Sequence, residues 1–459
     1  MPSPVPFILA DDPLNVMDQP RESRSYTSAS SPRRAMPMTS TSRPVRRSLP
    51  FLLAGLSMIG PFSIDAVFPA FPLIGERFGV DSTGLQQMIS MYLITYAVMS
   101  LFHGAISDAI GRKPVIVAGM LVYALASAGA ALSTSYVMLL SCRALQGACA
   151  GAGLVVGRAI VRDSLEGPAA QQMMSRVMLI FSIAPVIAPI IGAQLLFLNG
   201  WHGIFWVLMG FTLMLSLALM LFLDETHPVA ARTPFRAGTL MRGYVSFGKD
   251  RPFWPLLISC SVNFAGLFLY ISSAPHIIRD LLHLSAQGFP WLFLPTVAGL
   301  MTGAWISGRL AHRRSAAYTV NLGYGFMLLA CAAHLLIGLI TREPLLPWSM
   351  LPLILHGIGV QLAFPTLTLL LLDRFPQRRG GASSVQAFGS LLMCAVVAGV
   401  LSPLLSGHMV YLALGASALT VAGWFAWRWY LRLTSKPRVP HSSTAEVEVE
   451  LQTEITEPR

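Results

Sequence analysis

Long apolar segments follow one another along nearly the whole chain, from Leu49 to Leu433, and only short polar stretches separate them. A helix needs about 20 predominantly apolar residues to cross a hydrocarbon core of roughly 30 Å. The chain divides into segments of this length almost without remainder. The sequence therefore predicts an all-α integral membrane protein with little left over for a soluble domain.

The composition supports a membrane environment. Of 459 residues, 54% are apolar and 12% are charged, whereas soluble domains carry roughly 25% charged residues. The net charge of +11 comes from short basic clusters between apolar segments and not from a continuous basic stripe. A nucleic-acid partner is therefore not expected, and the lipid bilayer is.

We expect twelve spans in two six-helix bundles, with boundaries good to a few residues. Residues 1–47 form a Ser-, Pro- and Arg-rich tail that we predict to be disordered. The first bundle covers 48–223, a linker covers 224–252, the second bundle covers 253–432, and a second tail covers 433–459. The expected spans are 50–72, 86–107, 114–133, 136–157, 171–196, 201–223, 253–279, 289–309, 317–340, 346–372, 380–406 and 408–431.

Basic residues between the spans predict the orientation, because Lys and Arg are enriched in short cytoplasmic loops. They gather on the side that holds both tails and the linker 224–252, and the opposite side holds Arg77, Arg279 and Arg342. Both termini are therefore predicted to be cytoplasmic. This strong asymmetry also supports the span count, because a missed helix would place all later basic clusters on the opposite side of the membrane.

The sequence argues against cofactor and metal chemistry. The five cysteines all lie inside apolar segments and form no CxxC pair, so neither a zinc site nor a disulfide framework is expected. The chain contains no nucleotide-binding loop of the form G-x-x-x-x-G-K-[ST]. We also find no set of nucleophile and base at a plausible depth, so an enzyme is not expected. An ion gradient is then the expected energy source.

The polar turn between spans 2 and 3 reads GAISDAIGRKP. Gly104 and Gly111 permit close approach and a tight turn, and Asp108 can pair with Arg112 or with a neighbouring helix end. With Lys113, these residues are candidates for a cytoplasmic gate that favours one conformation. An ordinary polar turn is the alternative interpretation.

Two charged residues lie deep inside predicted spans. Asp65 is the one acid well within a span, and Arg143 is the deep base. Each lies about seven residues, or roughly 10 Å, from the outer end of its span, so the two are expected at the same depth. A buried charge costs several kcal/mol unless it is paired. We interpret them as a proton-coupling or substrate site, with a structural ion pair as the alternative.

Other polar and aromatic residues in the spans are candidates for a central substrate cavity. Tyr92 and Tyr96 share a helix face because they are four residues apart. His334 and His356 are the other mid-span groups that titrate near neutral pH, but hydrogen bonding between helices is the simpler role. The cavity candidates are Tyr92, Tyr96, Asn263, Tyr270 and Gln361.

Span 5 contains two internal prolines, Pro185 and Pro189, each of which removes a backbone hydrogen bond. The small residues Ala188 and Gly192 nearby allow close helix packing. We interpret the segment as a hinge at a domain interface, with simple small-residue packing as the alternative.

The motifs resemble those of the major facilitator superfamily. GAISDAIGRKP is similar to its G-x-L-x-D-R-x-G-R-K-P signature, with Ala109 in place of the first Arg. RALQGACAGAG, from Arg143, resembles its second motif. APIIGA, from Ala188 to Ala193, resembles its G-P-x-x-G-G antiporter motif, with alanine at both end glycines. SIDAVFPAFP, GRAIVRD, YISSAP and GGASS look like the bicyclomycin-resistance branch of drug exporters.

The resemblance covers about residues 50–430 and implies a function. We expect proton-coupled antiport that exports small amphipathic or apolar molecules, such as antibiotics, across the bacterial inner membrane, with a monomer as the unit. Rocking of the two bundles about a central cavity would move the substrate. Uptake of a sugar, organic acid or siderophore on the same fold and a sensor that binds without transport remain alternatives.

Overall fold

The computed structural model describes residues 48–165, 167–310, 313–341 and 343–435. Over these ranges all regular elements are helices, and eleven helical segments are long and apolar enough to cross a membrane. The prediction of an all-helical membrane protein is confirmed. The predicted tails lie outside the described residues, except that the last helix continues to Thr434.

In the first half of the chain, the described residues 48–165 and 167–223 contain six α-helices and one short 3₁₀ turn. Spans 1 to 4 match the predicted segments, although α3 and α5 extend several residues beyond them. The elements are α1 (Leu49–Asp65), η1 (Phe68–Ala70), α2 (Phe71–Phe78), α3 (Ser82–Ile110), α4 (Arg112–Ala131), α5 (Tyr136–Ser164) and α6 (Gly167–Phe222).

The helix α6 contains 56 residues and covers both the fifth and the sixth predicted span. Its backbone leaves helical geometry at Asn199 (φ −150°) and Gly200 (φ +56°). Gly200 lacks the Cβ that makes a positive φ costly. The chain therefore changes direction where the sequence predicts a turn between two spans.

The predicted linker 224–252 contains helical structure that we did not expect. It holds the 3₁₀ turn η2 (Val229–Ala231) and the helix α7 (Ala237–Phe247). The hydroxyl of Tyr244 on α7 donates a hydrogen bond of 2.5 Å to the carbonyl of Leu101 on α3. We call the end of the spans at which this segment lies the linker face.

The second half is more irregular than predicted. The predicted start of span 10 at residue 346 is wrong, because 346–351 form turns and the helix begins at Pro352. Spans 7 and 11 are each broken into several helical pieces. The elements are α8 (Phe253–Asn263), α9 (Ala265–Ser272), α10 (Ala274–His276), η3 (Ile277–Leu281), η4 (Ala286–Gly288), α11 (Pro290–Leu310), α12 (Ala316–Ile340), α13 (Pro352–Asp373), η5 (Pro376–Arg378), α14 (Arg379–Val396), η6 (Val397–Leu401), α15 (Ser402–Leu405) and α16 (Met409–Thr434).

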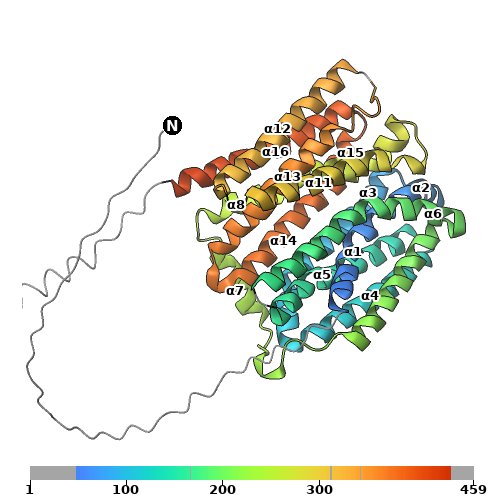
Figure 1. Ribbon diagram of the computed structural model, residues 1–459. Coiled ribbons are helices and arrows are strands. Elements are labelled where there is room, and N and C mark those ends of the chain that lie inside the picture. Colours follow the sequence, from blue (N-terminus) through green and yellow to red (C-terminus); the bar gives the residue numbers. More distant parts are fainter. Residues whose placement is uncertain (1–47, 166, 311–312, 342, 436–459) are drawn as a thin grey trace, which may run out of the picture. The chain divides into compact units, whose positions relative to one another are not determined.

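The helices pack as two groups that follow the order of the chain (Figure 1). In the first group α5 packs on α3 and α4, and α6 packs on α1 and α4; in the second, α13 packs on α11 and α12, and α16 on α8 and α12. Between the groups, α3 packs on α14 and α6 on α11. Gln86 and Ser90 of α3 donate hydrogen bonds to the carbonyls of Ser272 (2.7 Å) and Ala395 (3.0 Å), which tie the two groups together.

Candidate functional site

The side chain of Arg143 on α5 is completely buried in the first helical group. Its Nη1 donates a hydrogen bond to Oε1 of Gln146 at 2.8 Å, whereas Nε and Nη2 find no acceptor among the described residues. The guanidinium carbon lies 4.6 Å from the centroid of the Tyr92 ring. Such a contact contributes about 0.5–2 kcal/mol, which is less than the several kcal/mol that an unpaired charge in a membrane costs.

Polar side chains from four helices surround this arginine. Gln146 donates a hydrogen bond to the hydroxyl of Ser127 at 2.8 Å, and the hydroxyls of Ser63 and Tyr123 bond to each other. The Tyr92 hydroxyl has no partner among the described residues. We call this set the Arg143 cluster, and its members are Ser63, Tyr92, Tyr123, Ser127, Arg143 and Gln146.

Asp65 is the last residue of α1 and is 4% exposed. Within the described part of the chain its carboxylate forms neither a hydrogen bond nor an ion pair, so the ion pair expected with Arg143 is absent from this structure. Equal depth predicted the pair, but depth does not specify which face of a helix a side chain occupies. Among the described residues, Asp65 and Arg143 are thus buried without pairing with each other.

Tyr96 belongs with the first group of cavity candidates. Its ring packs edge to face on that of Tyr92, with the centroids 6.1 Å apart. Both side chains are buried. Tyr92 therefore has two close neighbours. The Arg143 guanidinium lies over the face of its ring, and the ring of Tyr96 packs on it edge to face.

The cavity candidates of the second group have three different sets of neighbours. Asn263, at the break between α8 and α9, contacts the sulfur of Met327 at 3.9 Å, and its Oδ1 has no donor among the described residues. Tyr270 stacks on His334 with the ring centroids 4.7 Å apart. Gln361 on α13 is half-buried and packs beside Gly303 of α11. Lining of one common cavity by these residues stays a prediction.

Two buried histidines of the second group also lack hydrogen-bond partners within the described ranges. Both ring nitrogens of His334 and of His356 are without a hydrogen bond to any described residue. His334 lies on α12 and His356 on the adjacent α13. They stay candidates for proton transfer in the spans.

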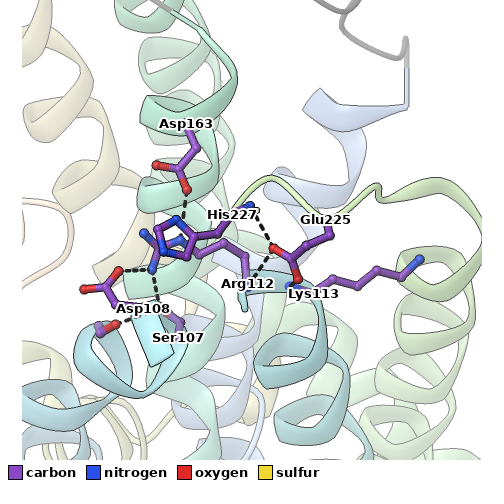
Figure 2. Close-up of polar contacts among 8 residues, drawn as sticks. Ser107, Asp108, Arg112, Lys113, Asp163, Glu225 and His227 are labelled. Atoms are coloured by element: carbon purple, nitrogen blue, oxygen red, sulfur yellow. Dashed lines mark hydrogen bonds and ion pairs between the residues drawn. The ribbon is translucent and has the colours of Figure 1, made fainter. Parts of the chain in front are cut away.

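Three of the predicted gate residues, Asp108, Arg112 and Lys113, take part in a connected network at the linker face (Figure 2). Arg112 pairs with Asp108 at 2.5 Å and with Asp163 of α5 at 2.9 Å, and it donates a hydrogen bond of 2.6 Å to the Ser107 hydroxyl. Arg112 is buried, whereas Asp108 is half exposed and Asp163 less so. The Asp108–Arg112 pair that the motif predicted is therefore present, and Asp163 is a further partner.

Glu225, which we did not predict, completes this network. Its Oε1 accepts from the backbone N–H of Arg112 at 2.9 Å and its Oε2 from that of Lys113 at 3.2 Å. A carboxylate at this position satisfies donors that a helix start leaves free and interacts well with the helix dipole. Gly111 has φ +116°, and a Cβ there would lie 2.5 Å from the Glu225 carboxylate. The only sequence feature that pointed to this contact was the presence of an acid just after the sixth apolar segment.

A second ion pair at the linker face belongs to the other helical group. Arg374, just after α13, donates hydrogen bonds of 2.6 and 2.7 Å to the two carboxylate oxygens of Asp250. The hydrogen bonds that Asp250 accepts raise the pKa of the Arg374 guanidinium above its ordinary value. Paired, planar contacts of this kind are among the stronger ones in proteins.

The predicted hinge segment packs tightly against the end of α1. Gly192 of α6 lies so close to α1 that a Cβ would stand 2.2 Å from the carbonyl oxygen of Ala66, the residue after Asp65. Ala188 is fully buried one turn earlier. At Pro185 and Pro189 the backbone of α6 remains helical. A hinge role stays a prediction, and the close contact with α1 is what the structure adds.

Comparison with known proteins identifies similar chains. The family model described as Major Facilitator Superfamily matches residues 53–397. An uncharacterised MFS-type transporter, YdgK, from Bacillus subtilis is 32% identical over 77% of this chain and 88% of its own length. A bicyclomycin resistance protein homolog from Haemophilus influenzae is 25% identical over 72% of this chain and 82% of its own.

Among solved structures, the human organic anion transporter MFSD10 has a similar fold. The TM-score is 0.62 and the identity 21%, and the match covers 83% of this chain and 98% of the other. At this identity the similarity describes the fold alone.

Proposed function

Because the chain belongs to the major facilitator superfamily, we propose that it is a proton-coupled antiporter that exports small amphipathic or apolar molecules, antibiotics among them. The family consists of transporters and not enzymes. The relative named for bicyclomycin resistance supports export of antibiotics. The bacterial inner membrane is the site that this proposal implies.

The observation that carries the proposal is the pair of uncompensated polar groups in the first helical group. Arg143 keeps two guanidinium nitrogens without acceptors, and Asp65 has no partner among the described residues. Ionisable residues inside spans are costly, and they typically mark ion or substrate pathways. A purely structural ion pair would bring the two charges together, which is not the arrangement found.

In the proposed cycle Asp65 carries the proton. A conformational change that moves Arg143 toward Asp65 favours the charged carboxylate and releases the proton, and movement away favours uptake. Substrate that binds beside the Arg143 cluster displaces the guanidinium toward Asp65 and so favours the charged carboxylate. Protonation and substrate binding then exclude each other, which is the requirement for antiport.

The proposed topology has twelve spans, with both termini in the cytoplasm. The predominantly apolar segment Ile183–Phe222 is 40 residues long, and one continuous helix of that length would extend about 60 Å at 1.5 Å per residue, twice the hydrocarbon thickness. Two spans that meet at Asn199–Gly200 explain that length. The linker face is then cytoplasmic, in keeping with its basic residues.

The Asp108–Arg112–Asp163 network and Glu225 join the ends of α3, α4, α5 and the segment after α6, all from the first group. We propose that they keep this group rigid while the two groups rock against each other. Rocking of rigid halves about a fixed site is the usual form of alternating access.

Reconstituted protein in vesicles with an acidic interior tests the proposal. Addition of bicyclomycin and of a panel of amphipathic antibiotics on the outside should release protons from the vesicles in proportion to substrate uptake. Empty vesicles and the Asp65→Asn variant are the controls. Binding without flux would indicate a sensor, and proton and substrate movement in the same direction would indicate uptake; either result would overturn antiport.

A further inference from the structure

A cavity of about 450 Å³ opens at the face opposite the linker. Its walls come from the turn between α1 and α3 and from the connection between α8 and α11, so both helical groups contribute. We call it the outer vestibule and define it by Phe68, Glu76, Gln86, Asp280 and Phe289. We propose that it binds organic cations that carry N–H donors on an apolar, aromatic body.

The apolar part of the vestibule is aromatic. Phe68 and Phe289, from different helical groups, have nearly parallel rings (7°) with the centroids 6.4 Å apart. Phe71 meets Phe68 edge to face at 5.7 Å. Aromatic faces attract both other rings and cations, so these walls suit a flat organic cation.

Gln86 is the polar residue that distinguishes ligands with an N–H donor from ligands without one. The residue lines the vestibule and is 1% exposed. Its Nε2 donates to the Ser272 carbonyl at 2.7 Å, which fixes the orientation of the amide. Its Oε1 is left without a donor among the described residues. A buried acceptor without a partner costs about 1–3 kcal/mol, so a ligand that donates an N–H recovers this loss and an anion without donors does not.

The charged rim favours the same ligand. Glu76 and Asp280 are exposed at the vestibule, and Glu76 forms no hydrogen bond or ion pair with the described residues. His276 bonds to the Asp280 carboxylate, and Arg279 supplies one opposing charge. A free carboxylate and an unpaired amide oxygen together select a donor cation.

The vestibule is distinct from the Arg143 cluster, since no member of that cluster lines it. Phe68 follows Asp65 by three residues, so the cavity lies just beyond the end of α1. Binding there requires neither a proton gradient nor transport. Its test therefore gives an answer even if the proposed antiport is wrong.

Cysteine protection tests the site in full-length protein in right-side-out vesicles. Ser82 is exposed and lines the vestibule, and Thr134 is exposed on the turn between α4 and α5 without lining it. Ser82→Cys and Thr134→Cys are labelled with a membrane-impermeant sulfonated maleimide, with the labelling of unmodified protein subtracted. The probe is dansylcadaverine, a naphthalene with a primary ammonium group, and its neutral control is dansylamide.

We expect dansylcadaverine to slow labelling of Ser82→Cys severalfold and to leave Thr134→Cys unchanged. Gln86→Leu should raise the protecting concentration about tenfold, which corresponds to loss of a hydrogen bond to a charged donor. Glu76→Gln, an exposed change that leaves the fold intact, should raise it about threefold. The same results are expected in the Asp65→Asn background.

Three outcomes would overturn the proposal. Equal protection by dansylamide would show that the cation is not recognised. Equal protection of Thr134→Cys would show a general effect on the membrane surface. Unchanged protection in both Gln86→Leu and Glu76→Gln would show that neither polar group selects the ligand.

Discussion

The carboxylate of Glu225 accepts hydrogen bonds from the backbone N–H of Arg112 at 2.9 Å and from that of the next residue at 3.2 Å (Figure 2). The side chain of the same arginine is held between Asp108 and Asp163. Arg112 is therefore tied through its backbone to the segment after α6 and through its guanidinium to α3 and α5. This arrangement makes the first turn of α4 the point at which four helix ends meet.

We expect Glu225→Gln to weaken this meeting point. The neutral amide loses the favourable interaction with the helix dipole and one charge-assisted acceptor, at a cost of about 1 kcal/mol. Thermal unfolding of purified protein measures the change. Glu343→Gln, an exposed acid at the opposite face, is the matched control and should unfold as wild type does. Equal stability of the two variants would contradict the capping role.

The two aspartates that pair with Arg112 should contribute differently to stability and to transport rate. Asp108 is more exposed than Asp163, and solvent screens an exposed pair to below about 1 kcal/mol. Asp163→Asn should therefore lower both stability and transport rate more than Asp108→Asn does. Substrate affinity should stay near wild type in both, because the cavity candidates are untouched. Wild-type turnover in both variants would exclude a role in conformational change.

Close packing of α1 and α6 gives a third prediction. In Gly192→Ala the new Cβ would stand 2.2 Å from the Ala66 carbonyl, and relief of such a clash typically costs about 1–3 kcal/mol. Gly210→Ala on the same helix is the control, since no atom lies within 4 Å of a Cβ there. The stability of this control variant should be equal to that of wild type or slightly higher, because alanine favours the helix. Thermal unfolding in one detergent compares them.

The spans were largely predictable because burial of backbone in lipid forces long apolar helices. Hydropathy does not separate a helix from apolar turns, which is why the expected start at residue 346 was wrong. Glu225 was missed because it binds backbone N–H groups, which every residue except proline carries. The separation of Asp65 from Arg143 depends on the rotation of each helix about its axis, and distance along the span does not report that rotation.

The absence of an Asp65–Arg143 pair predicts additive stability effects. Changes at residues that share no contact usually add to within about 0.5 kcal/mol. The change in unfolding free energy of the double variant should therefore equal the sum of the changes in Asp65→Asn and in Arg143→Gln. Transport should not follow the same rule, because the proposed cycle couples the two charges during turnover. A stability coupling well above 1 kcal/mol would show that they pair in the resting protein.

Asp65→Asn is the decisive variant for the proposed mechanism. Asparagine has nearly the same shape but cannot carry a proton, and Asp65 is the one acid deep in a predicted span. Export driven by a pH gradient should be lost, whereas binding and downhill exchange of uncharged substrates should continue. The measurement is substrate-driven proton release from reconstituted protein beside wild type, with binding assayed on the same preparation to show that the variant is folded. If the variant still releases protons on addition of substrate, Asp65 is not the obligatory carrier. His334 and His356, whose ring nitrogens lack partners among the described residues, would then be the groups to replace next.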